Sequence, residues 1–132
     1  MEQAKKILVV DDDPDIVDYF SSFLKDHGYE VSSANGSESA LAALDKVRPD
    51  AILIDVLMPG RSGLDLLVTI RRNQRWGEIP MVVVTGSDKI LEDDCQSYLG
   101  SHQKVRGPDG VLGKPIDRKA LLAILKRLIG SD

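Results

Sequence analysis

The polar side chains that follow four short apolar runs are the residues of this chain best suited to chemistry. In chain order they are Asp11, Asp12, Asp13, Asp55, Thr85 and Lys114. Carboxylates that crowd together repel one another unless a cation is bound, and a hard divalent ion prefers oxygen ligands. Magnesium fits best, because it takes one or two protein carboxylates together with waters and a phosphate oxygen. The residue types therefore indicate Mg²⁺-assisted phosphoryl transfer.

The same residues divide into a nucleophile and its helpers. A carboxylate can accept a phosphoryl group, while a metal, an ammonium group and a hydroxyl offset the charge on the phosphoryl oxygens. Asp55, Lys114 and Thr85 would fill the roles of acceptor, ammonium group and hydroxyl. Plainer interpretations stand beside these, because aspartate is common in turns, threonine favours strands and lysine usually lies in solvent. For Asp13 the plain interpretation, a helix cap before Pro14, is the better one.

Short apolar runs alternate with segments of helical periodicity along the chain. The runs predict strands at Ile7–Val10, Tyr29–Ser33, Ala51–Ile54, Met81–Val84 and, more weakly, Val111–Leu112. Apolar residues recur at helical spacing at Ile16, Val17, Phe20, Phe23 and Leu24, at Leu41, Leu44 and Val47, at Leu64, Leu67 and Val68, and at Leu121, Ile124, Leu125, Leu128 and Ile129. This order predicts an α/β doubly wound fold, (βα)5, whose parallel sheet is covered on both faces. Ligands of such sheets bind beyond the carboxyl ends of the strands, where the polar residues follow.

Residues at the helix ends support this segmentation. Ser37 and Asp117 stand where N-caps are expected, and Gly28 can close the first helix. Cations suit a helix C-terminus, so three basic residues are interpreted as a solvated helix end rather than a nucleic-acid patch. These are Arg71, Arg72 and Arg75.

Length and composition limit the class of protein. The chain has 132 residues and a formal net charge of −4, with 42% hydrophobic and 29% charged residues. That balance is ordinary for one globular domain, and the negative charge argues against direct binding to nucleic acid. No apolar stretch approaches the length of a membrane span or of a signal-peptide core. We therefore expect a single cytoplasmic domain over residues 1–132, with no output domain and no membrane contact.

Four segments resemble, in order, the signature segments of bacterial response-regulator receiver domains of the chemotaxis-regulator-like type. They are ILVVDDDPD, ILIDVLMPGRSGLDLL, VVVTGS and GKP, and the resemblance covers essentially the entire chain. It implies a flavodoxin-like sheet with the strand order 2-1-3-4-5. It implies also that Asp55 is the phosphoacceptor, and that Mg²⁺ is held by Asp12, Asp55 and the backbone carbonyl of Leu57. Asp11 would assist through water.

The resemblance further implies a two-component signalling switch rather than an enzyme that acts on other molecules. Such a domain catalyses its own phosphorylation and dephosphorylation, with Thr85 turning toward the phosphoryl group and Lys114 pairing with it. The donor would be a phosphohistidine on a histidine kinase or a histidine phosphotransfer protein. The signal would leave by protein contact or by phosphorelay.

The sequence departs from the family pattern in two places. The 28 residues between Thr85 and Lys114 exceed the usual length, and their patchy periodicity with a Gly- and Pro-rich end makes the fourth helix doubtful. The family usually has an aromatic residue three positions before the lysine, where this chain has Val111. Another residue, such as Tyr98, would have to transmit the signal, or the switch works differently.

Two rival functions remain open. In a haloacid-dehalogenase-like phosphatase Asp11 would be the nucleophile and Asp13 its acid partner, but Asp15 stands where that motif requires Thr or Val. A degenerate receiver that only binds partners is favoured by the altered fourth helix and by Val111, although its acceptor residues are complete.

Overall fold

The computed structural model describes residues 4–55, 63–85, 109–113 and 117–130. Its sheet has five parallel strands in the order β2-β1-β3-β4-β5, namely β1 (Lys6–Val10), β2 (Glu30–Ala34), β3 (Ala51–Asp55), β4 (Met81–Thr85) and β5 (Gly110–Gly113). The described helices are α1 (Pro14–Asp26), α2 (Ser37–Val47), α3 (Gly63–Arg71) and α5 (Arg118–Ile129). The doubly wound fold and its strand order are confirmed. The segment of the doubtful fourth helix, 86–108, lies outside the described residues.

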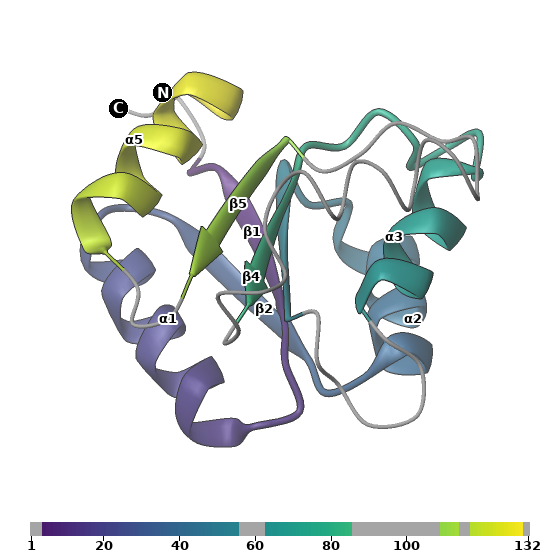
Figure 1. The fold of residues 1–132 in the computed structure, drawn as a ribbon, viewed down its shortest axis with the longest axis horizontal. Coiled ribbons are helices and arrows are strands. Elements are labelled where there is room, and N and C mark those ends of the chain that lie inside the picture. Colours follow the sequence, from purple (N-terminus) through teal and green to yellow (C-terminus); the bar gives the residue numbers. More distant parts are fainter. Residues whose placement is uncertain (1–3, 56–62, 86–108, 114–116, 131–132) are drawn as a thin grey trace.

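Helices cover both faces of the sheet, with α1 and α5 on one side and α2 and α3 on the other (Figure 1). Successive strand residues point to opposite faces, so each buried strand contributes to two cores. In β1, Ile7 and Val9 contact the layer of α1 and α5, while Leu8 and Val10 contact the layer of α2 and α3. All four are at most 1% exposed, which explains why the central strands are apolar throughout instead of alternating.

Helix α1 has the two ends that the sequence predicted. Asp13 is its N-cap and accepts a hydrogen bond from the backbone N–H of Asp15 at 2.9 Å, with Pro14 in the first turn. At the other end Gly28 has φ +90°, a left-handed conformation that glycine adopts without a steric penalty. The N–H groups of Gly28 and Tyr29 donate to the carbonyls of Lys25 and Leu24, the bonding of a Schellman motif.

The predicted cap at Ser37 is wrong, whereas the one at Asp117 is confirmed. Asp117 accepts hydrogen bonds from the N–H groups at 119 and 120. In α2 the N-cap is Gly36, and Ser37 is already the first helical residue. The side chains that close this end lie on either side of the cap, because the Asn35 N–H donates to Ser39 Oγ at 3.1 Å and that hydroxyl donates to Asn35 Oδ1 at 2.8 Å.

Arg71 is buried, which contradicts its interpretation as a solvated cation. Its side chain is 2% exposed and forms an ion pair with Asp109 at 2.7 Å. The guanidinium also donates to the carbonyls of Gly77 and Ile79, at 3.0 and 2.9 Å. Asp109 accepts in addition from the N–H of Met81 at 2.8 Å, so one buried pair joins the end of α3 to the starts of β4 and β5. For Arg75, 56% exposed beside Asp45, the solvated interpretation is confirmed.

In the described part of the chain, no helix combines the length and the apolar character needed to cross a membrane.

The two ion pairs should differ sharply in their contribution to stability. Arg71→Met keeps the aliphatic stem but removes the cation paired with a partly buried carboxylate and the donor to two carbonyls, so we expect a loss of about 3 kcal/mol in the free energy of unfolding. Arg75→Met, at the exposed pair, should change it by less than about 0.5 kcal/mol. Urea unfolding of both variants measures the difference. Equal losses would contradict the role assigned to Arg71.

Candidate functional site

The strand register brings the ends of β1, β3 and β4 together at the carboxyl edge of the sheet. The residue that precedes Asp11 is paired with the residue that precedes Asp55. Asp55 is in turn paired with the residue that precedes Thr85. Because neighbouring strands lie about 4.8 Å apart, the backbones of Asp11, Asp55 and Thr85 form one short row. The register thus brings the backbones of these three predicted site residues to one edge of the sheet.

Asp11 is held inside the protein, whereas Asp12 faces solvent. The Asp11 residue is 3% exposed. Its Oδ1 accepts from the N–H of Asp13 at 3.0 Å, and its own N–H donates to the carbonyl of Ala34 at 3.1 Å. These bonds hold the start of the loop between β1 and α1 and fix the position of the Asp11 carboxylate.

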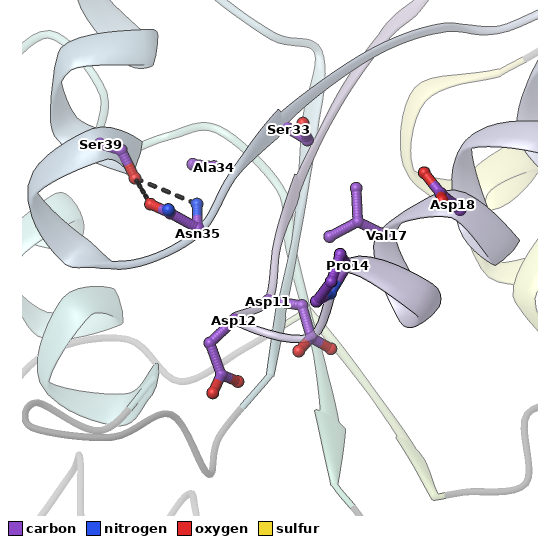
Figure 2. Close-up of a pocket in the computed structure, with 9 residues that line it drawn as sticks. All are labelled: Asp11, Asp12, Pro14, Val17, Asp18, Ser33, Ala34, Asn35 and Ser39. Atoms are coloured by element: carbon purple, nitrogen blue, oxygen red, sulfur yellow. Dashed lines mark hydrogen bonds between the residues drawn. The ribbon is translucent and has the colours of Figure 1, made fainter.

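A cavity of about 630 Å³ opens beside these two carboxylates. Figure 2 shows it between the N-terminus of α1 and the loop that joins β2 to α2, with the hydrogen-bonded Asn35 and Ser39 on the far wall. Asp18 of α1 and Ser33 of β2 also line it. Sequence reasoning missed this wall, although one signal was present: Asn35 is a polar residue placed just after a strand, as the recognised site residues are.

The charge of this region is strongly negative. Residues 11–18 contain five aspartates and no lysine or arginine. The N-terminus of α1 offsets a part of this charge, since its free N–H groups favour nearby carboxylates. The remaining repulsion is lowered when a cation binds, which makes the carboxyl edge an attractive environment for a divalent ion.

Several of the predicted site residues are not described in full. Leu57 and Lys114 lie outside the described residues, and of Asp55 and Thr85 the backbone alone is described. Within the described side chains, no group of three or more His, Cys, Asp or Glu is arranged to hold a metal ion. The predicted magnesium site also includes Asp55 and Leu57. The described part of that site is therefore the row of backbones and the carboxylates of Asp11 and Asp12.

The chain matches a family model described as response regulator receiver domain over residues 7–126. This range contains all the predicted site residues. The match confirms the family resemblance that the four sequence segments indicated.

Solved structures with the same fold cover nearly the whole chain. The chemotaxis protein CheY4 of Vibrio cholerae is 30% identical, with a TM-score of 0.81 over 95% of this chain and 98% of that one. A putative response regulator from Chloroflexus aurantiacus is 26% identical, with a TM-score of 0.82 over 96% and 98%. The response regulator TrrA of Thermotoga maritima, in complex with Mg²⁺-BeF, is 28% identical, with a TM-score of 0.78 over 94% and 98%. The flavodoxin-like fold is thereby confirmed.

Asp12 and Asp13 are neighbours in sequence but should respond differently to substitution. Asp13→Ala removes the N-cap bond of α1 and is expected to lower the free energy of unfolding by about 1 kcal/mol. Asp12→Ala removes an exposed carboxylate from a crowded acidic loop and should leave stability within about 0.5 kcal/mol. Urea unfolding in the presence of EDTA tests this; a larger loss for Asp12→Ala would show that Asp12 is structural.

Proposed function

Because this chain belongs to the family of response-regulator receiver domains, we propose that it is a phosphorylation-dependent switch whose acceptor is Asp55. The single observation that carries the proposal is the backbone row at the carboxyl edge, which sets Asp55 between the acidic loop after β1 and Thr85. A phosphoryl group accepted at that position would have a carboxylate-bound cation on one side and a hydroxyl on the other. That is the charge arrangement that phosphoryl transfer requires.

Magnesium is the cation that fits this edge. Asp11 is a buried carboxylate with one described backbone donor, Asp12 is exposed beside it, and the cavity next to both leaves room for the ion's waters. Asp12, Asp55 and the carbonyl of Leu57 would hold the ion, with Asp11 acting through water. Bound Mg²⁺ supplies positive charge against the phosphoryl oxygens. The Thermotoga maritima regulator, whose structure contains Mg²⁺-BeF, supports this assignment by analogy.

The remaining residues would act on the modified state. Asp55 attacks phosphorus in line as the bond to the donor's histidine nitrogen breaks, so the phosphoryl group moves from nitrogen to the carboxylate oxygen. The Thr85 hydroxyl and the Lys114 ammonium group then offset its charge. The donor is a histidine kinase or a histidine phosphotransfer protein of the cytoplasm. The signal leaves by contact with a target protein or by relay to another histidine.

The phosphatase alternative is weakened by the position of Asp13. In that reading Asp13 is the acid partner of an Asp11 nucleophile, but its side chain is committed to capping α1 through the N–H of Asp15. Asp11 is buried and accepts a hydrogen bond from the loop, which suits a supporting carboxylate better than an attacking one. The degenerate-receiver alternative rests on the altered fourth helix and on Val111, and the acetyl phosphate experiment distinguishes it from the switch.

Acetyl phosphate provides the direct test of the acceptor. With Mg²⁺ present, we expect the wild-type chain to gain the mass of one phosphoryl group and Asp55→Asn to gain none, because an amide cannot form the acyl phosphate. Intact-mass spectrometry reads the result, and EDTA should abolish the gain. A wild-type chain that is never modified would support the degenerate receiver. Turnover of acetyl phosphate that depends on Asp11 and not on Asp55 would support the phosphatase.

The assignment of Asp12 to the metal has its own test. Asp12→Asn should weaken Mg²⁺ affinity by about tenfold or more, because it removes a charged oxygen ligand. Asp18→Asn is the matched control: it removes one charge from the same cavity without touching the ligand set, and should weaken binding by less than about threefold. Isothermal titration calorimetry measures both. Equal effects would mean that the edge attracts the ion by its overall charge alone.

A further inference from the structure

A second pocket lies at the amino edge of the sheet, at the opposite end of β3 and β4 from the candidate functional site. It has a volume of about 390 Å³ and is lined by Arg48, Pro49, Arg75, Trp76 and Ile79. The first two precede β3, and the last three precede β4. A five-residue strand separates this pocket from the row at the carboxyl edge, which is roughly 16 Å at the rise of a β-strand. The proposed phosphorylation chemistry does not use it.

The wall that comes from the α3–β4 loop is fixed before any ligand arrives. The side chain of Asn73 accepts from the N–H groups of Arg75 and Trp76 at 2.8 and 3.3 Å. The buried Arg71 holds the far end of the loop through the carbonyls of Gly77 and Ile79. The Trp76 and Ile79 side chains pack on the core formed with α2 and α3. A preorganised wall of this kind lowers the entropic cost of binding a ligand.

The other wall holds an arginine in a conformation that arginine disfavours. Arg48 is the C-cap of α2 with φ +52°, and among the described residues it is the one non-glycine residue with positive φ. Its N–H donates to the carbonyl of Leu44, and the buried Pro49 follows it. Glycine or asparagine usually fills such a position. Backbone strain of this type concentrates at sites where the side chain has a use.

We propose that this pocket binds a planar aromatic molecule that carries a phosphate group, of the class of the nucleoside monophosphates. Trp76, Pro49 and Ile79 offer an apolar surface with an aromatic ring, and the volume lies within the range of about 300–1,000 Å³ of small-molecule sites. Arg48 and Arg75 bring two guanidinium groups from separate segments. Two cations match a dianionic phosphate better than a monoanionic carboxylate, and guanidinium forks suit phosphate oxygens.

Arg75 is available to such a ligand despite its ion pair. Its partner is Asp45 at 3.3 Å, and the two side chains are 56% and 61% exposed. Exposed pairs of this kind contribute little, so a bound phosphate can displace the carboxylate. Asp45 therefore competes with the ligand for Arg75.

Trp76 makes the proposal directly measurable, because it is the single tryptophan of the chain. Titration of the full chain with AMP, with tryptophan emission as the signal and calorimetry as an independent readout, should give a saturable change. Inorganic phosphate and adenosine, titrated separately, should each bind at least about tenfold more weakly, since each satisfies one half of the pocket. No saturable AMP signal up to about 10 mM, or equal affinity for phosphate or adenosine alone, overturns the proposal.

Variants of the two arginines separate ligand binding from folding. Arg48→Gly relieves the left-handed strain, so urea unfolding should show no loss of stability while AMP affinity falls about tenfold. Arg75→Gln should lower the affinity similarly, and Asp45→Asn should raise it a few-fold by removing the competitor. The matched control is Lys46→Ala, which removes an exposed cation two residues before Arg48 but outside the pocket lining and should leave the affinity within about twofold. Wild-type affinity in Arg48→Gly and in Arg75→Gln contradicts the assignment.

Discussion

The alignment of the parallel strands is the constraint on which the rest of the structure depends. Two aspartates pin it at the amino edge by the same bonding. Asp50 donates its N–H to the carbonyl of Lys6 at 2.7 Å and accepts the N–H of Lys6 on its carboxylate at 2.8 Å. Asp109 bonds to Met81 in the same two ways, at 2.7 and 2.8 Å. Because a strand is nearly inextensible, fixing one end of β3 and β5 fixes where their other ends emerge.

The carboxylates at the two edges of the sheet lie in different electrostatic environments. At the amino edge the partly buried carboxylate of Asp109 has a guanidinium partner, so its charge is compensated within the fold. At the carboxyl edge Asp11 is buried beside the exposed Asp12, and its carboxylate accepts a hydrogen bond from the N–H of Asp13. Crowded carboxylates of this kind lower the stability of a fold and favour the binding of a cation, which is common where function competes with stability.

The sequence predicts those features whose causes are local. Apolar runs located both ends of each strand to within one residue, and Asp13 and Asp117 were identified as caps by their type and position. Arg71 was misjudged because its partner lies 38 positions away, and nothing near it in the chain distinguishes a buried arginine from a solvated one. The N-cap of α2 is Gly36 and not the expected Ser37, because the hydrogen bonds at the start of this helix involve Asn35 and Ser39. For the candidate site, the sequence predicted the edge of the sheet and the acids that lie there. The wall that Asn35 and Ser39 form after β2 could be identified from the fold alone.

The β4–β5 edge suggests how a change at Thr85 could travel without an aromatic residue at 111. Val111 has one side-chain torsion and packs against the core beside α2 and α3, so it offers no long side chain to swing outward. Thr85 is paired with Gly113, however, and a methyl group at Gly110 would lie 3.1 Å from Ile124 of α5. Such close approach leaves no slack between strand and helix. The paired backbones of β4 and β5 and the close approach of Gly110 to Ile124 therefore connect Thr85 to α5 without an aromatic side chain at position 111.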